Sequence, residues 1–518
     1  MTETMNGAVA LLRTAEALGA QVCFANPGTT ELVLVRALEE VTAIRPVLGL
    51  FEGVCTGAAD GYARVSGRPA LTLLHLGPGF ANGVANLHNA RRAHSAIINI
   101  IGDHATWHLP FDAPLTSDIE SLASPVSGAV IRLNSAAHVA SDVAAAFRKA
   151  ASPPGAIVTL IAPTDVMEGS APEVVAAPSP DLRPAAQVPE GQVAACAQLM
   201  AKPGPLVLLI GGAALGERGL RAAARIQEAS GARLLMEPYP AIVDLGGDLP
   251  HLERLAYFPD DVIRQLGDAK VILAGAREPI SYFGYEGQPS QLVHADRLTE
   301  LASPEDDTVL ALEQLADKLG AAKTGPAPRA PAPAAPPPGF SPAAIVEALI
   351  ALMPEGTIVS LEGSTLGGPF LQQAHRARRH RVMTNTGGAI GQGLPCAVGA
   401  AIACPEARVI SLQSDGSAHY TLQALWTMAR EGLPITVIIA ANHRYGILQT
   451  ELRRSGADLD QPVLDRLTQL DQPRADWVAL AQGYGVQAVR AADAESFRAA
   501  LQQGLDLAGP FLIQAELP

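Results

Sequence analysis

The stretch Ala407 to Leu448 reads ARVISLQSDGSAHYTLQALWTMAREGLPITVIIAANHRYGIL, and the rest of the chain is interpreted outward from it. An apolar run at 409–412 ends at the turn 414–416, and apolar side chains with helical spacing follow the turn. A second apolar run at 435–440 ends at Asn442. Strand, helix and strand with short connections predict a right-handed βαβ unit with two parallel strands.

Two polar side chains, Asp415 and Asn442, follow the carboxyl ends of these predicted strands. In parallel sheets ligands bind outside those ends, and neighbouring strands lie about 5 Å apart. A carboxylate and an amide oxygen at this separation suit Mg²⁺, which completes its coordination with phosphate oxygens. Ser417 and the free N–H groups of a helix starting near Ala418 are expected to face the same phosphates. The alternative is that Asp415 is a turn residue and N-cap, and Asn442 a loop former.

This stretch resembles the diphosphate-binding motif of thiamine diphosphate (ThDP) enzymes, in which Gly-Asp-Gly is followed at a distance by Asn-Asn. Ser414 stands where the motif has its first glycine, and Ala441 where it has its first asparagine. The resemblance implies ThDP and Mg²⁺ as cofactors. It also implies three metal ligands, namely Asp415, Asn442 and the backbone carbonyl of Arg444. Three further residues, Gly416, Ser417 and Tyr445, are implied to bind the cofactor.

Length and composition exclude several classes of protein. The 518 residues predict two to four domains, and 48% hydrophobic residues are enough to fill several cores. A formal net charge of −14 argues against nucleic acid as a partner. The five cysteines show no zinc-ligand spacing and are expected to be free thiols in a reducing cytoplasm. Because no secretory signal and no apolar run of membrane-spanning length is seen, we expect a cytoplasmic protein without a membrane partner.

Alternating strand and helix patterns divide the chain into three blocks, 1–165, 192–320 and 340–518. Segments rich in Pro and Ala, at 166–191 and 321–339, are expected to be the linkers between them. Over the whole chain this plan resembles that of ThDP-dependent decarboxylases and acetolactate synthases. The resemblance implies three doubly wound parallel-sheet α/β domains, which are pyrimidine-binding, central and diphosphate-binding in chain order. It further implies a homodimer or homotetramer with active sites shared between subunits.

In the central block, Gly211 and Gly212 follow a predicted strand, as the glycines of a dinucleotide-binding turn do. The GxGxxG pattern is incomplete, and no acidic residue is expected at a strand end about twenty residues further on. Some members of the family bind FAD or another nucleotide in this domain. Here the sequence favours a plain structural turn.

Glu52 precedes the small-residue segment GAADGYAR at 57–64. ThDP enzymes place a glutamate here, and the resemblance implies that Glu52 is catalytic and contacts the cofactor. The chemistry requires a proton at N1′ of the aminopyrimidine, and a buried carboxyl group with a raised pKa can supply it. The alternative is that Glu52 is a first-turn carboxylate stabilised by its helix dipole.

The segment TNTGGAIGQGLPCAVG at 384–399 resembles the other half of the cofactor site. The resemblance implies that Ile390 supports the thiazolium ring and that the carbonyl of Gly388 accepts a hydrogen bond from the 4′-amino group. Glycines permit the close approach that this contact requires. Upstream, Ser364 and Thr365 follow a predicted strand and resemble the hydroxyl donors of a second diphosphate loop, although a plain strand-to-helix turn would look similar.

On the substrate side, Thr29 and His75 stand where benzoylformate decarboxylase has a serine and a histidine, and the motifs are most similar to those of that enzyme. The resemblance implies that both residues are catalytic, through hydrogen bonds to the substrate and proton transfer by His75. A second histidine of that enzyme is missing from the segment SYFGY, where Phe283 is the expected counterpart. His104 and His108 are the candidates to substitute for it.

The resemblance thus implies an enzyme, a ThDP-dependent decarboxylase or carboligase that acts on a small 2-oxo acid. Loss of CO₂ gives an enamine, which adds to a second carbonyl, as in acetolactate synthase, or is protonated to an aldehyde. The alternatives are a dedicated benzoylformate-type decarboxylase, a hydrolase that cleaves a C–C bond of a dione, and a non-catalytic protein that keeps the ThDP fold.

Overall fold

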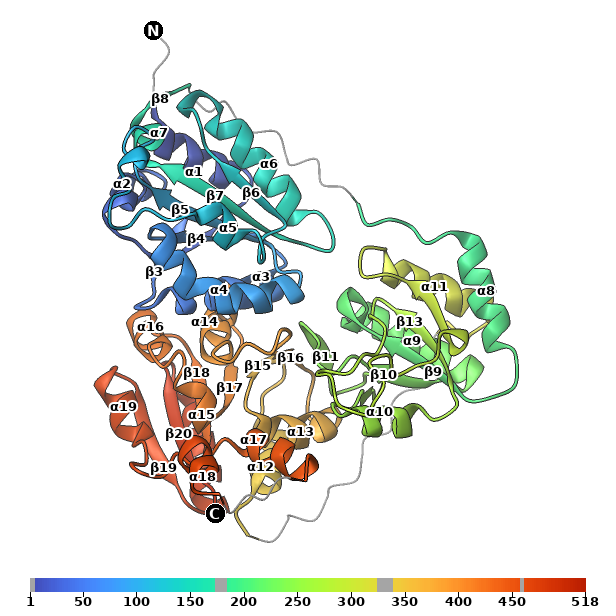
Figure 1. Ribbon diagram of the computed structural model, residues 1–518. Coiled ribbons are helices and arrows are strands. Elements are labelled where there is room, and N and C mark those ends of the chain that lie inside the picture. Colours follow the sequence, from blue (N-terminus) through green and yellow to red (C-terminus); the bar gives the residue numbers. More distant parts are fainter. Residues whose placement is uncertain (1–4, 173–183, 324–338, 457–460) are drawn as a thin grey trace.

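The computed structural model describes residues 5–172, 184–323, 339–456 and 461–518. These residues form three α/β bodies that follow one another along the chain (Figure 1). Each body is built on one mainly parallel β-sheet, so the predicted fold of three parallel-sheet α/β domains is confirmed. The middle parts of the two predicted linkers, 173–183 and 324–338, lie outside the described residues. None of the helices in the described ranges is long and apolar enough to span a membrane.

The N-terminal body is a six-stranded parallel sheet with the strand order β3-β2-β4-β5-β7-β6. Its strands are β2 (Val22–Asn26), β3 (Arg45–Leu48), β4 (Ala70–Leu74), β5 (Ile97–Asp103), β6 (Ala129–Arg132) and β7 (Ile157–Pro163). Its helices are α1 (Gly7–Ala17), α2 (Leu32–Glu40), α3 (Glu52–Ser66), α4 (Leu76–Arg92), α5 (Ile119–Ala123), α6 (Val139–Ala151) and α7 (Thr164–Glu168). Because β8 (Ser170–Ala171) pairs with β1 (Met5–Asn6), the first residues of the predicted linker at 166–191 pack on this body.

The central body is a five-stranded parallel sheet with the strand order β12-β10-β9-β13-β14. Its strands are β9 (Leu206–Ile210), β10 (Arg233–Met236), β12 (Glu253–Arg254), β13 (Lys270–Ala274) and β14 (Leu298–Ala302). Its helices are α8 (Glu190–Met200), α9 (Glu217–Ser230), α10 (Pro259–Leu266) and α11 (Thr308–Lys318).

The C-terminal body is a seven-stranded sheet with the strand order β11-β16-β15-β17-β18-β20-β19. Six strands are parallel, namely β15 (Thr357–Leu361), β16 (His380–Thr384), β17 (Val409–Ser414), β18 (Ile435–Ala441), β19 (Gln487–Ala491) and β20 (Phe511–Glu516). The seventh, β11 (Val243–Leu245), comes from the central segment and pairs antiparallel with β16. The helices are α12 (Pro342–Leu352), α13 (Ser364–Gln373), α14 (Gly393–Ala403), α15 (Asp415–Ala418), α16 (Ala424–Glu431), α17 (Gly446–Arg454), α18 (Pro462–Thr468), α19 (Trp477–Gly483) and α20 (Ala494–Asp506).

The predicted βαβ unit at 407–448 is present in this sheet, with one difference. Strands β17 and β18 are parallel neighbours, and Ser414 lies opposite Ala440. The predicted single helix between them is divided into α15 and α16. The helix is interrupted where the Thr421 hydroxyl donates a hydrogen bond to the carbonyl of Gly391 (2.8 Å).

Helix α3 of the N-terminal body packs against α14 of the C-terminal body, and α4 packs on α3 (Figure 1). Small residues permit this contact, because a Cβ added to Gly61 would lie 2.2 Å from the carbonyl oxygen of Cys396. A Cβ added to Gly399 would lie 1.9 Å from the carbonyl oxygen of Ala58. Buried apolar side chains continue from one sheet to the other through these helices, so the two bodies share one hydrophobic core.

Candidate active site

A cavity of about 320 Å³ lies at the carboxyl ends of the strands of the C-terminal sheet. Segments that follow β15, β16, β17 and β18 form most of its lining, as the βαβ topology predicts. The predicted cofactor-binding residues that line it are Ser364, Thr365, Gly388, Ile390, Gly416, Ser417, Arg444 and Tyr445. Glu52, Asp415 and Asn442 are not among the lining residues.

Asp415 joins the ends of the two neighbouring strands β17 and β18. The residue is buried, and its carboxylate accepts hydrogen bonds from the backbone N–H groups of Gly416 (2.8 Å) and His443 (2.6 Å). Burial raises the pKa of this carboxyl group, and the two backbone N–H groups oppose the shift. Each carboxylate oxygen keeps at least one lone pair that these two bonds do not use. The carboxylate therefore has the capacity to bind a cation in addition to its structural role.

The oxygens of Asn442 and Arg444 that were predicted to bind a metal have internal partners. The side-chain oxygen of Asn442 accepts a hydrogen bond from the N–H of Arg444 (3.2 Å), and its amide nitrogen donates to the Thr365 hydroxyl (3.1 Å). The carbonyl of Arg444 accepts from the N–H of Gly446 (3.0 Å). Because an amide or carbonyl oxygen has two lone pairs, each of these oxygens retains one for a cation.

The two predicted diphosphate loops touch each other. The Ser414 hydroxyl donates to the Thr365 hydroxyl (3.1 Å), and a Cβ added to Gly363 would lie 2.5 Å from the backbone nitrogen of Ser414. Ser417 is held within its own turn, since its hydroxyl donates to the carbonyl of Ser414 (3.0 Å). Ser364 is exposed at the start of α13. The serine that replaces a glycine of the motif therefore links one loop to the other.

Glu362 is a residue of the cavity that the sequence analysis did not identify. Its carboxylate accepts hydrogen bonds from the N–H groups of Gly391 (2.6 Å), Gln392 (3.0 Å) and Gly393 (2.9 Å), at the N-terminus of α14. Burial raises the pKa of this group, and these N–H groups act in the opposite direction. The available signal was its position directly after β15, which matches that of Asp415 after β17.

The three predicted catalytic residues lie in the N-terminal body, outside the cavity of their own chain. Glu52 is the first residue of α3, is buried, and accepts a hydrogen bond from the side chain of Asn82 (3.0 Å). His75 precedes α4, and the side chains of Glu52 and His75 both lie against Gly79. Thr29 is exposed in a short 3₁₀ turn after β2.

Glu31 is a second residue that the sequence analysis missed. It is fully buried, and one of its carboxylate oxygens lies 2.8 Å from Nδ1 of His75 and accepts from the N–H of Gly28 (2.7 Å). The Thr30 hydroxyl donates to the other oxygen (2.7 Å) and lies 3.4 Å from the same Nδ1. Thr30 is therefore the threonine placed to contact the His75 ring, and Glu31 orients that ring. An acidic residue ending the polar segment after β2 was the available signal.

The wall of the cavity opposite the sheet is aromatic and comes from the central segment. The ring centroid of Tyr282 lies 5.8 Å from that of Tyr239, 5.1 Å from that of Tyr257 and 5.2 Å from that of Phe283. Phe283, the expected counterpart of the missing histidine, belongs to this wall. The rings of His104 and His108 lie 5.6 Å apart in a loop of the N-terminal body, and neither lines the cavity.

The expectation that no acidic residue follows a strand near the Gly211–Gly212 turn is wrong. Glu237 directly follows β10, and its carboxylate accepts a hydrogen bond from the N–H of Gly212 (3.1 Å). Burial raises the pKa of Glu237 to about 7. At the N-terminus of α9, Asp244 accepts from the N–H of Glu217 (2.7 Å). The amide groups that a dinucleotide phosphate would use therefore already bind carboxylates of the chain itself.

The donor groups that follow the carboxyl ends of β15, β17 and β18 fit a hard cation and a diphosphate. A carboxylate, an amide oxygen and a backbone carbonyl, from Asp415, Asn442 and Arg444, form the all-oxygen set that Mg²⁺ prefers. The hydroxyls of Ser364 and Thr365 are suitable donors to phosphate oxygens. A Cβ added to Gly416 would lie 2.6 Å from the Tyr445 ring, so only glycine leaves this turn its present shape.

Comparisons with known proteins agree with this geometry. Residues 5–122 match the N-terminal TPP binding domain of thiamine pyrophosphate enzymes, and residues 368–515 match the C-terminal TPP binding domain, TPP being another abbreviation for ThDP. A Mycobacterium tuberculosis protein, IlvX, whose name groups it with acetolactate synthase large subunits, is 45% identical over 99% of both chains. Benzoylformate decarboxylase of Pseudomonas aeruginosa is 29% identical over 96% of both. The ThDP-dependent 4-hydroxybenzoylformate decarboxylase of Rhodococcus jostii superimposes with a TM-score of 0.85 at 25% identity, covering 99% of both chains. The chain belongs to the thiamine pyrophosphate enzyme family.

Proposed function

We propose that this protein is a ThDP- and Mg²⁺-dependent enzyme that removes CO₂ from a 2-oxo acid. The observation that supports the proposal is the cavity, which is lined by Gly388, Gly416 and Ser417 of the C-terminal body and by aromatic side chains of the central segment. The remaining carbon fragment is released as an aldehyde or joined to a second carbonyl compound. The acidic composition and the buried free thiols support a cytoplasmic location.

Each part of the chain has a defined task in this proposal. When bound, ThDP supplies the carbon nucleophile and accepts the electrons released with CO₂. Asp415, Asn442 and the carbonyl of Arg444 hold the metal, while Ser364 and Thr365 donate hydrogen bonds to the diphosphate. Three residues would place the two rings of the cofactor: Ile390 would support the thiazolium, the Gly388 carbonyl would accept from the 4′-amino group, and Glu52 would hold a proton at N1′.

A panel of 2-oxo acids distinguishes the candidate reactions. Each acid is supplied with ThDP and Mg²⁺, and CO₂ and all carbon products are measured. CO₂ with aldehyde alone supports a dedicated decarboxylase, and CO₂ with 2-hydroxy ketone or acetolactate-type product supports a carboligase. Cleavage of a cyclic dione without CO₂ supports C–C hydrolysis. A protein that binds ThDP and releases no product from any acid or dione contradicts the proposal and supports a non-catalytic role.

We expect His75 to control the fate of the carbon fragment. Nδ1 of the ring lies against the Glu31 carboxylate, and Nε2 has no hydrogen-bond partner among the described residues, so Nε2 is available to take up a proton and pass it on. Since the SYFGY segment provides no second histidine, proton delivery is slow enough for a second carbonyl to compete. The variant His75→Ala should therefore shift the product ratio toward ligation, measured by chromatography at fixed acceptor concentration. The exposed His138→Ala is the matched control, and a fall in rate at an unchanged ratio would restrict His75 to substrate positioning.

We further propose that each active site is shared between two subunits. Glu52 is not among the residues that line the cavity of its own chain, which supports a site completed by Glu52 of a second copy. Mixing Glu52→Gln and Asp415→Ala subunits should then restore activity, because one site of each mixed dimer contains neither change. Random reassociation gives about one quarter of the wild-type activity. If both residues served the same chain, every mixture would remain as inactive as the separate variants.

A further inference from the structure

The loop 385–391 carries two predicted cofactor contacts, the carbonyl of Gly388 and the side chain of Ile390. Gly388 and Gly391 have positive φ angles of +78° and +108°, so the loop follows no regular secondary structure. Polar backbone groups in such a loop need side-chain partners, and Asn385 of the loop itself provides two, donating to the carbonyl of Ala389 (2.8 Å) and accepting from the N–H of Gly388 (2.8 Å). These partners determine where the backbone groups of the loop lie relative to a bound cofactor.

Helix α4 of the N-terminal body supplies several of them. Asn89, which is fully buried, donates from its amide nitrogen to the carbonyl of Ala389 (2.7 Å) and accepts from the N–H of Ala389 (3.1 Å). Nε2 of His88 lies 3.1 Å from the carbonyl oxygen of Gly387. A Cβ added to Gly387 would lie 2.6 Å from the side-chain oxygen of Asn89, so the loop rests directly on this helix.

The arrangement satisfies alternate carbonyl groups along the loop. The carbonyls of Gly387 and Ala389 are bonded as described, and that of Gly391 accepts from Asn86 (3.3 Å) and Thr421 (2.8 Å). In the described parts of the chain, no hydrogen bond is formed to the carbonyl of Gly388. These side chains of α4, Asn86, His88 and Asn89, are called the clamp below. The clamp leaves the carbonyl of Gly388, a residue of the cavity wall, available as an acceptor.

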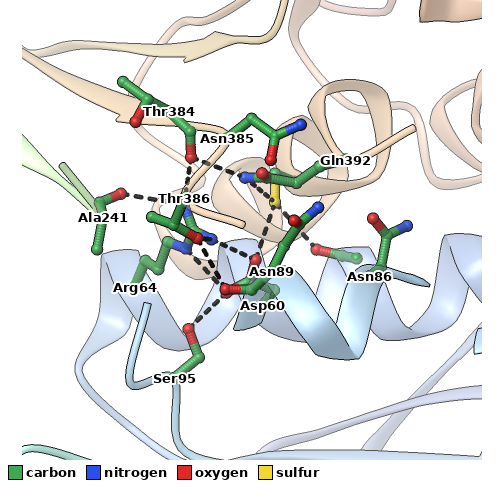
Figure 2. Close-up of polar contacts among 12 residues, drawn as sticks. Asp60, Arg64, Asn86, Asn89, Ser95, Ala241, Thr384, Asn385, Thr386 and Gln392 are labelled. Carbon is green, nitrogen blue, oxygen red and sulfur yellow. Dashed lines mark hydrogen bonds and ion pairs between the residues drawn. The ribbon is translucent and has the colours of Figure 1, made fainter. Parts of the chain in front are cut away.

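The stem of the loop is held by the same body (Figure 2). Arg64 donates to the carbonyl of Thr384 (2.8 Å) and lies 2.6 Å from Asp60 in an ion pair whose side chains are at most 1% exposed. The Thr386 hydroxyl donates to the backbone carbonyl of Asn89 (2.7 Å). The loop and its stem are therefore both held by side chains of helices α3 and α4, of which α3 packs on α14.

We propose that Asn89 is a positioning residue of the cofactor site. Through its two bonds to Ala389 it fixes the peptide between Gly388 and Ile390, and so presents the Gly388 carbonyl in its acceptor position before ThDP binds. Such preorganisation lowers the cost of ordering the loop on binding. The inference rests on the proposed function only in placing the 4′-amino group of ThDP at the Gly388 carbonyl.

The test compares Asn89→Ala with Asn99→Ala. Asn99 is an equally buried asparagine of the same body, with side-chain hydrogen bonds to Thr72 (2.8 Å) and Thr159 (3.2 Å) and no contact with the loop. Titration calorimetry measures the ThDP dissociation constant at saturating Mg²⁺. Hydrogen exchange of the peptide covering 385–392, followed by mass spectrometry without cofactor, measures the order of the loop itself. Thermal unfolding measures the general loss of stability.

We expect Asn89→Ala to raise the ThDP dissociation constant about tenfold, the scale of one buried hydrogen bond, and to speed exchange in 385–392. Asn99→Ala should lower the unfolding temperature without either effect. The partly exposed His88→Ala, which loses one clamp bond, should change both readouts in the same direction by less. Unchanged exchange in Asn89→Ala, or an equal loss of affinity in Asn99→Ala, overturns the inference. Faster exchange at unchanged affinity also overturns it, and if wild-type protein still decarboxylates, the proposed function stands.

Discussion

Replacement of Glu52 by glutamine is expected to slow hydrogen–deuterium exchange at C2 of bound ThDP by at least about 100-fold, the usual scale of general acid–base catalysis. Glutamine has the same size as glutamate and can still accept the hydrogen bond from Asn82. It cannot, however, hold a proton that is exchanged with N1′. The exchange rate is measured by NMR after rapid quenching in acid.

The Glu52→Gln variant should affect the exchange reaction alone, and this can be tested with a control variant. Glu52→Gln should fold and bind ThDP with nearly wild-type affinity, because the carboxyl group is replaced by a neutral group of equal volume. Glu39→Gln, an exposed change on α2, should leave exchange unaltered. Exchange at the wild-type rate in Glu52→Gln would mean that another group protonates N1′. Glu52 would then be no more than a first-turn carboxylate of α3.

Replacement of Asp415 by alanine is expected to weaken Mg²⁺-dependent binding of ThDP by more than about 100-fold. Loss of a residue that merely supports a metal ligand already costs about 10- to 100-fold in affinity, and Asp415 is the only carboxylate in the proposed ligand set. Calorimetry with ThDP at several Mg²⁺ concentrations measures both the affinity and its dependence on the metal.

The alternative is that Asp415 is a purely structural turn residue, and a second variant controls for this possibility. Asp493 caps α20 in the same body, where its carboxylate accepts from the N–H of Ser496 (2.8 Å). Asp493→Ala should lower the unfolding temperature slightly, as the loss of a helix cap does, and leave ThDP binding unchanged. If Asp415→Ala behaves in the same way, with unaltered ThDP affinity, the metal assignment fails.

The parts of the fold that could be predicted from the sequence are those set by local pattern. The runs at 409–412 and 435–440 are apolar almost throughout, which is typical of strands buried on both faces, and they form β17 and β18. Asp415 and Asn442 follow these apolar runs closely and were therefore expected to mark the ends of the strands. Because the two strands are parallel neighbours, their carboxyl ends lie side by side, and the proximity of these two residues could be predicted from this topology.

What could not be predicted depends on contacts between distant segments. The apolar spacing at 422–429 predicts one helix, but the helix is interrupted before this segment, where the Thr421 hydroxyl donates a hydrogen bond to the carbonyl of Gly391. Glu31 and Glu362 look like ordinary residues after strands, and their roles arise from partners 44 and 29 residues away. Glu237 was overlooked because β10 (Arg233–Met236) contains only three consecutive apolar residues, too short a run to predict a strand from the pattern. A local pattern contains no information on which N–H group a carboxylate will meet.

The pairing of β11 with β16 limits how this chain can be shortened. Strand β11 covers the edge of the catalytic sheet with a segment that precedes the other strands of that sheet by more than a hundred residues in the sequence. A shortened chain without the central body would leave the N–H and C=O groups at this edge of β16 unpaired, and such exposed edges promote self-association. The central body is therefore not a removable module. A minimal version of the enzyme would need a replacement strand, or a proline or charged side chain on β16, to remain monodisperse.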